Sequence, residues 1–467
     1  MLHLLCLVLV VGCLGVSVLA GEAAQFDFNT DTATLLSRLE APAGLVHPEQ
    51  SYCSGILLSD SGAQLYVANE EMALYQYTNT AVEASDPVWS DAVSLVPSET
   101  TRVPQSGYPG AMAHNGKEVL VVGAPYWDRD GAVFVWDASG TDPVEIAMLT
   151  RTRLYGQEIE AKGDTLLVGM AGGVDVYSLY DKDGGISPVL RGTLSMPEDA
   201  MIWPEVLRLT SDRMLVSGYY YEKDARCIDV YDRETLEPMP DSQLCGVSDD
   251  DFANTFEVVE AEGEEIVIAS MSDSTVQRLD SLEGEYSKAG AVSVWRWETE
   301  TLTYKSCGTV ESEVPLTNAQ FGRDITYDSV SQVLAVGKVG LDHGCDNSSE
   351  RYGAVELLGC SVSDLLTGSC TYLGSIVPVG TGSINHGSIG NGLLVVSAND
   401  PGTDSLEHYS AYVFGVHYAN NTQTPVWMYV CIAVVVLVLV GLGLYVIHSS
   451  SRDKAYDALL LPGEVYE

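Results

Sequence analysis

The sequence predicts an all-β fold, a seven-bladed β-propeller, and three observations indicate it. A short apolar run that ends on a small residue recurs seven times, at irregular intervals of 46 to 68 residues. These runs are rich in Val, Ile and Leu and bounded by Gly, Asn, Asp or Ser, which is typical of strands. The last unit lacks a strand that the N-terminal region can supply. The small residues that end the runs are Ala68, Gly123, Gly169, Gly218, Ala269, Gly337 and Ser397.

The residues around each run repeat as well. An aromatic-Gly lead-in precedes the run in Tyr155-Gly156 and Phe321-Gly322, and the second copy has Tyr108-Pro-Gly110 in that place. A second apolar run that begins with Gly follows, most fully at 131–136 and again at 290–295. This array resembles the FG-GAP repeat, the blade motif of integrin α-subunit propellers, over roughly residues 34 to 416. The resemblance implies a propeller ectodomain.

Each unit also has room for four strands. Further strands are expected before the lead-ins at 89–97, 189–194 and 372–377. A four-stranded sheet cannot bury both of its faces alone, whereas seven sheets in a ring can. The last unit stops after its third strand at 411–416, and the strand expected at 34–41 would close the ring without leaving an open edge. The alternative is an array of two or three β-sandwich domains, which would not need a small residue at the same strand position seven times.

The two ends of the chain predict a single-pass type I membrane protein. Residues 4–20 are apolar and free of charge, as in a secretory signal peptide. Residues 426–447 are again free of charge and long enough to span a bilayer as a helix, and Arg452 and Lys454 follow them. A glycolipid anchor is the alternative, against which the polar tail argues. The expected parts are a signal peptide at 1–20, the propeller at 21–416, a stalk at 417–425, the transmembrane helix at 426–447 and a cytoplasmic tail at 448–467.

Charge indicates what the propeller does not bind. The formal net charge is -42, so nucleic acid and anionic lipid are repelled, while cationic partners are attracted. Solubility is the simplest use of such a surface.

The cysteines and sequons suit an oxidising compartment. Two pairs are close enough in sequence to bridge adjacent strands of one blade, and a third could link the ends of another blade. Cys53 is then left over, as a buried thiol or an intermolecular link. Two Asn residues lie in glycosylation sequons, at a loop and at the stalk. The pairs are Cys227 with Cys245, Cys360 with Cys370 and Cys307 with Cys345, and the sequons start at Asn347 and Asn420.

No pattern of residues predicts catalysis, a metal or a cofactor. The eight histidines are scattered, and no nucleophile elbow, phosphate-binding loop or Cys-x-x-Cys is present. An integrin-type propeller binds calcium between the first and second strands of a blade. The corresponding turns here, such as 114–117 and 161–164, are poor in oxygen ligands, so ordinary hairpin turns are expected. The chain is expected not to be an enzyme, and an ectoenzyme is a remote alternative.

The loops between second and third strands are the candidate ligand-binding sites. They are rich in aromatic and charged residues and share a face of the ring with the connections between blades. The last strand runs away from this face, so we expect the face to point away from the membrane. The alternative is that the aromatic rings pack between blades. The candidate residues are Tyr126, Trp127, Asp128, Asp130, Tyr219, Tyr220 and Tyr221.

The tail adds a sorting motif. Tyr456-Asp-Ala-Leu459 fits the tyrosine-x-x-hydrophobic signal that clathrin adaptors bind. Two functions follow: a cell-surface protein that recognises an extracellular protein or glycan, or a cargo-sorting receptor of the endomembrane system. The plasma membrane is the expected location for the first, and Golgi and endosomes for the second.

Overall fold

The computed structural model describes most of the region between residues 26 and 416. Its described residues are 26–28, 33–39, 52–59, 61–69, 74–80, 87–90, 92–95, 112–140, 143–151, 154–181, 184–247, 250–277, 285–341, 352–378, 384–399 and 409–416.

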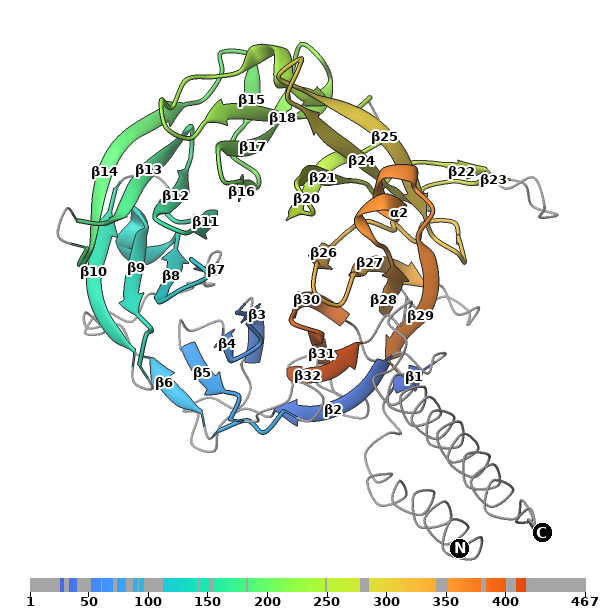
Figure 1. Ribbon diagram of the computed structural model, residues 1–467, viewed down its shortest axis with the longest axis horizontal. Helices are drawn as coiled ribbons and strands as arrows, with labels where there is room; N and C mark the ends of the chain where they lie inside the picture. The colour runs from blue at the N-terminus through green and yellow to red at the C-terminus, as the bar shows by residue number, and fades with distance from the viewer. Residues whose placement is uncertain are drawn as a thin grey trace, which may run out of the picture. The chain divides into compact units, whose positions relative to one another are not determined.

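Seven antiparallel sheets are arranged in a ring and one two-stranded hairpin lies beside them, which confirms the seven-bladed propeller (Figure 1). In each blade four main strands run outward from the centre of the ring in sequence order, except that the fourth strand of blade 7 comes from the N-terminal region. One short edge strand at the start of blade 4, the small hairpin beside blade 5 and the N-terminal strand added to blade 6 are additional to these. Blade 1 contains β3 (Tyr52–Leu58), β4 (Gln64–Asn69), β5 (Leu74–Thr78) and β6 (Val93–Leu95). Blade 2 contains β7 (Met112–His114), β8 (Val119–Ala124), β9 (Ala132–Asp137) and β10 (Val144–Thr150), with the 3-10 helix η2 (Trp127–Arg129). Blade 3 contains β11 (Ile159–Lys162), β12 (Thr165–Met170), β13 (Gly173–Tyr180) and β14 (Ile186–Ser195).

The remaining blades carry the additional elements. Blade 4 contains β15 (Ala200–Ile202), β16 (Leu207–Leu209), β17 (Arg213–Tyr220), β18 (Ala225–Asp232) and β19 (Leu244–Cys245), with η3 (Pro240–Ser242). Blade 5 contains β20 (Phe252–Ala261), β21 (Glu264–Met271), β24 (Ala291–Glu298) and β25 (Thr303–Glu311), beside the hairpin of β22 (Val276–Gln277) and β23 (Glu285–Tyr286). Blade 6 contains β26 (Ile325–Asp328), β27 (Val333–Leu341), β28 (Tyr352–Gly359), α2 (Val362–Thr367) and β29 (Thr371–Pro378). Blade 7 contains β30 (Ile384–Gly390), β31 (Leu393–Asn399), β32 (Tyr409–Val416) and β2 (Ala33–Leu39).

The seven recurring apolar runs are the second strands of the seven blades, as predicted. In β8 every residue is buried, because each face of the strand contacts a neighbouring sheet. Val119 and Val121 pack with Leu166 and Val168 of blade 3, whereas Leu120 packs toward blade 1. Burying one such side chain stabilises the fold by about 1.5–3 kcal/mol. The core of this protein is therefore a series of layers between blades.

The ring closes between the two ends of the propeller, also as predicted. β2, expected at 34–41 and observed at Ala33–Leu39, pairs antiparallel with β32, from Ala33 opposite Val416 to Leu39 opposite Ala411. Blade 7 thus takes its outer strand from the N-terminal region (Figure 1).

A second N-terminal strand adds to blade 6, which the sequence did not lead us to expect. β1 (Phe26–Phe28) pairs antiparallel with β29, with Phe26 opposite Pro378 and Phe28 opposite Ile376. Blade 6 therefore has five strands. The N-terminal region covers the outer edge of one blade and completes the next.

The aromatic-Gly lead-in has a structural reason. Tyr155 forms a parallel bridge with Gly131, which precedes the third strand of the previous blade, and both Tyr155 and the equivalent Phe321 are fully buried. The following Gly156 lies so near Gly123 that a Cβ added at Gly123 would be 2.0 Å from the Gly156 carbonyl oxygen. The repeated small residues are thus required where two blades meet.

The predicted membrane and targeting segments lie outside the described residues. These are the signal peptide at 1–20, the stalk at 417–425, the transmembrane helix at 426–447 and the tail at 448–467, which contains Tyr456 and Leu459. Within the part of the chain that the structure describes, no helix is long and apolar enough to cross a membrane. Both sequon residues, Asn347 and Asn420, and also Cys345 and the side chain of Cys53 are likewise outside it.

Candidate functional site

Two ends of the ring can be distinguished. The upper face carries the loops between second and third strands and the connections between blades, and the lower face carries the other turns. Eight of the fifteen large apolar side chains that are exposed among the described residues lie on the upper face, and the other seven are divided between the lower face and the outer strands. Those on the upper face are Tyr126, Met196, Met201, Ile202, Tyr221, Val247, Val314 and Leu316.

In blade 2 the candidate loop divides into exposed and buried residues. Tyr126 is 52% exposed, and Asp128 and Asp130 are exposed as well. Trp127, in contrast, is buried and packs edge-to-face on Phe134, with 5.1 Å between ring centroids. The expectation that Trp127 contacts a ligand is therefore wrong: its ring belongs to the core between blades 1 and 2.

In blade 4 the three consecutive tyrosines also divide. Tyr221 is 77% exposed, and Tyr219 is partly exposed and donates its hydroxyl to Asp224. Tyr220 is buried, so the expectation that it contacts a ligand is wrong as well. Alternation along β17 turns Tyr220 inward, where its hydroxyl donates to Asp229.

Asp229 is the centre of a buried polar network below the upper face. Besides Tyr220, it accepts hydrogen bonds from Trp203 Nε1 at 3.0 Å and from Gln243 Nε2 at 2.7 Å. Burial raises the pKa of the Asp229 carboxyl above its ordinary value, although these three donors oppose the effect. The network fixes Trp203, a residue of the connection between blades 3 and 4.

That connection and the blade 4 loop place four apolar side chains on the upper face. Met196, Met201, Ile202 and Tyr221 form what we call the blade 3–4 patch, and their exposed fractions are 38%, 65%, 49% and 77%. β15 contains Met201 and Ile202 and is the edge strand of its sheet. The sequence analysis selected Tyr221 and missed the other three, because Met and Ile beside a strand are usually residues of the core.

The centre of the ring is hollow. A cavity of about 1030 Å³ is lined by the first strands of all seven blades. Glu158 and Glu160 face Arg208 there, and burial raises the pKa of each carboxyl to about 7, against the effect of the guanidinium. Arg208 also forms an ion pair with Glu257 at 3.5 Å. Within the described residues, no three His, Cys, Asp or Glu side chains are grouped so that they could hold a metal ion.

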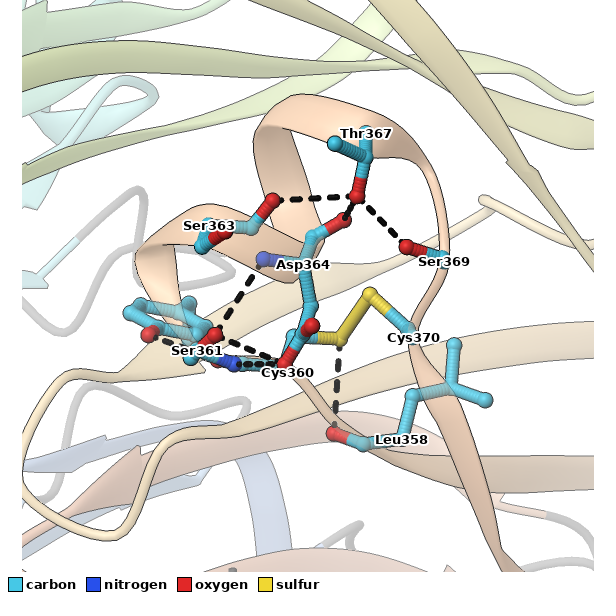
Figure 2. The surroundings of a disulfide bond; sticks show 9 residues. Leu358, Cys360, Ser361, Ser363, Asp364, Thr367, Ser369 and Cys370 are labelled. Carbon is cyan, nitrogen blue, oxygen red and sulfur yellow. Dashed lines mark hydrogen bonds between the residues drawn. A yellow bond between two sulfur atoms is a disulfide. The ribbon is translucent and has the colours of Figure 1, made fainter.

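Two of the cysteine pairs suggested by the sequence form disulfides. Cys227 is bonded to Cys245 across β18 and β19, and Cys360 is bonded to Cys370 around α2 (Figure 2). A capping box between Ser361 and Asp364 begins α2, which lies inside the second disulfide loop. Cys307 carries a free thiol, and Cys345, its suggested partner, lies outside the described residues.

No protein-family model matches the sequence, and no curated protein matches it. Its fold is similar to that of solved propellers at low sequence identity. A chain of the mitotic checkpoint complex has 12% identity and a TM-score of 0.47, covering 82% of this chain and 95% of that chain. The β-propeller domain of Cps50 (Swd1) from Myceliophteria thermophila has 9% identity and a TM-score of 0.49, covering 80% and 100%. The C-terminal WD40 domain of Sif2 has 10% identity and a TM-score of 0.47, covering 83% and 99%. At these identities the likeness concerns the fold alone.

Proposed function

We propose that the chain is a single-pass type I membrane protein whose propeller binds an extracellular or lumenal protein or glycan ligand through its upper face. The gathering of exposed apolar side chains on the upper face carries the proposal. Rigid aromatic and apolar residues surrounded by polar ones are the usual anchors of protein interfaces. The last described residue, Val416, lies at the lower-face end of β32, on the opposite side of the ring from the upper face.

The candidate contact residues are those that the structure leaves exposed. Tyr126 and Tyr221 supply the aromatic anchors, and Asp128 and Asp130 supply charge beside the first of them. Tyr219 is a weaker candidate because its hydroxyl is already bonded to Asp224.

Photocrosslinking in living cells tests the ligand-binding role. A photoreactive amino acid replaces Tyr126 or Tyr221 on the upper face, and Val330 serves as the control because it is 71% exposed on the lower face. We expect a discrete crosslinked product from the two upper-face positions. Equal products from Val330, or none from either tyrosine, would contradict a binding role for the upper face.

Membrane topology has a separate test. An epitope tag placed before β1 should be accessible to antibody on intact cells or after selective opening of the lumen, whereas a tag at the C-terminus should require access to the cytosol. Accessibility of the C-terminal tag from outside would exclude the type I arrangement.

The second candidate function is cargo sorting. The motif Tyr456-Asp-Ala-Leu459 favours it, because clathrin adaptors bind such tails. In a sorting receptor, Tyr456→Ala should raise the amount of protein at the cell surface several-fold and slow its internalisation. A resident surface protein should show no change, and the alternative would then be dropped.

We also propose that the chain is an FG-GAP-type, integrin-α-like propeller. The contacts between neighbouring blades, here called joints, support this at Tyr155-Gly156 and Phe321-Gly322. In both joints the aromatic residue is buried and forms a bridge with a Gly that precedes a third strand. No calcium is assigned to it, and titration with micromolar calcium should leave the melting temperature unchanged.

A further inference from the structure

The blade 3–4 patch comes from two neighbouring segments of the chain, the connection between blades 3 and 4 and the loop of blade 4. The Tyr221 backbone N–H donates to the Asp199 carbonyl at 3.1 Å, and Ile202 lies opposite Tyr219 in the sheet. On the other side, the Met196 N–H donates to the Gly172 carbonyl at 3.2 Å. These backbone contacts place residues from three separate loops beside one another.

The patch rests on a rigid base. Trp203 follows Ile202 directly and is buried, with its indole N–H bonded to Asp229. The Cys227–Cys245 disulfide ties β18 to β19 in the same blade. A surface that is already ordered loses little conformational entropy when a partner binds, so its apolar area can contribute to affinity.

Carboxylates surround the patch. Glu198 and Glu222 are exposed, and Asp199 and Asp224 lie beside them in the same two loops. Lys223 is the basic residue among them, and its ammonium is held by the Gln243 side chain and lies 5.1 Å from the centre of the Tyr220 ring. The rim is therefore negative, in a chain whose net charge is -42.

We propose that the blade 3–4 patch docks a segment of a partner protein in which apolar side chains are interleaved with Lys or Arg. This inference rests on the proposed ligand-binding function and names its site and the chemistry of its partner. The apolar side chains of the segment cover Met201, Ile202 and Tyr221, and its basic side chains pair with the carboxylate rim. β15 is an edge strand, so an extended segment can lie along it with alternate side chains facing the patch. Anionic lipid and nucleic acid are repelled by the same rim.

A defined peptide tests the proposal on the full-length protein in non-ionic detergent. The probe is a 12-residue peptide of alternating Leu and Lys that carries one photoreactive group, and its products are mapped after trypsin digestion. The patch falls in the tryptic fragments 192–208 and 214–223. Two matched peptides replace Lys with Glu or Leu with Ser. We expect crosslinks to concentrate in the two fragments and to fall about tenfold with either matched peptide.

Variants separate the patch from the acidic surface in general. Met201→Ser with Tyr221→Ser should reduce the crosslinking about tenfold, and Glu198→Gln with Glu222→Gln should reduce it severalfold and weaken its dependence on salt. Matched controls on the lower face are Leu302→Ser with Val330→Ser, which are 56% and 71% exposed, and Glu234→Gln with Glu237→Gln, which are exposed. Both controls should bind the peptide as the wild type does.

Crosslinks elsewhere on the chain, or equal binding by the patch variants, would overturn the proposal. The cellular crosslinks from Tyr126 distinguish this failure from that of the proposed function. If they persist when the patch variants lose nothing, the upper face binds a ligand and the patch assignment is wrong. If they are absent while the peptide still maps to the patch, the patch chemistry stands and the wider function fails.

Discussion

The joint between blades 2 and 3 and the joint between blades 3 and 4 use the same inner geometry with different residues. In the first, Tyr155-Gly156 lies against Gly131 and Gly123 of blade 2. In the second, Trp203-Pro204 takes that place: the Gly172 N–H donates to the Trp203 carbonyl at 3.2 Å, and a Cβ added at Gly169 would be 2.9 Å from Pro204 Cγ.

The difference between them lies on the upper face. The chain reaches Tyr155 five residues after the end of β10, whereas Trp203 comes eight residues after the end of β14, and the three additional residues form β15. Met201 and Ile202 are exposed as a result. The inner part of a joint is thus fixed by close packing, while its outer part can lengthen and acquire a binding surface.

The largest expected effect concerns the two joint glycines. Both have left-handed backbones, with φ of 96° at Gly131 and 88° at Gly172. A Cβ at Gly131 would be 2.4 Å from the Tyr155 nitrogen, whereas a Cβ at Gly172 would have nothing within 4 Å. We expect Gly131→Ala to destabilise the protein by more than about 3 kcal/mol and Gly172→Ala by about 1 kcal/mol, measured by thermal unfolding. Equal losses would mean that the two joints are equally tight.

The second prediction concerns the outer strands. Blade 2 is completed by β10, which is seven residues long, whereas β19 of blade 4 has two residues and a disulfide. Replacing Cys227 and Cys245 by Ser should cost about 3 kcal/mol, the value typical of a loop of this length, and should loosen the blade 3–4 patch. Cys307→Ser, at the free thiol, is the control and should leave the melting temperature unchanged.

Neighbouring tyrosines provide a smaller and cleaner comparison. Tyr220→Phe removes one of the donors to the buried Asp229 and should cost about 2 kcal/mol. Tyr221→Phe changes an exposed hydroxyl and should stay within ~0.5 kcal/mol. Chemical unfolding of both variants measures the difference, and a loss at Tyr221 as large as at Tyr220 would show that the exposed ring is part of the core.

A pH dependence of stability arises beside the contact between blades 2 and 3. The pKa of Glu158 and of Glu160 is about 7 in the folded chain, against an ordinary value of 4.5. Between these values the folded state holds more protons than the unfolded state, so these groups make stability fall as pH rises from 4.5 to 7. Glu158→Gln with Glu160→Gln should flatten the fall in melting temperature over this range. Glu234→Gln with Glu237→Gln removes the same charge from exposed positions and should not flatten it.

The repeating parts of the fold could be predicted because they obey local rules. Apolar runs that end on Gly123 or Gly169 could be identified as second strands, because close packing at these positions excludes a side chain. The last unit lacked an outer strand, and this predicted that β2 would complete it. The role of Trp203-Pro204 was not predicted, because these residues occupy the contact between blades 3 and 4 without the aromatic-Gly pattern. β1 escaped notice because three residues carry no periodicity.

The candidate site was only partly predictable, since exposure depends on distant partners. Trp127 and Tyr220 lie in polar, aromatic loops that resemble binding loops in sequence. Phe134 and Asp229, one strand further along, draw these rings into the core. The adjacent Tyr126 and Tyr221 are exposed, and nothing in the sequence distinguishes them from the two buried rings.

Closure of the ring by β2 sets an order of events during synthesis. Among the described strands, residues 33–39 leave the ribosome after β1 and before all the others, yet their partner strand, 409–416, leaves last. Because synthesis adds about 5–20 residues per second, on the order of half a minute passes between the emergence of β2 and that of its partner strand. Throughout that time blade 7 is incomplete and the growing array has open strand edges that could pair with other chains. A chaperone that covers strand edges should therefore matter most to this protein before its last blade has emerged.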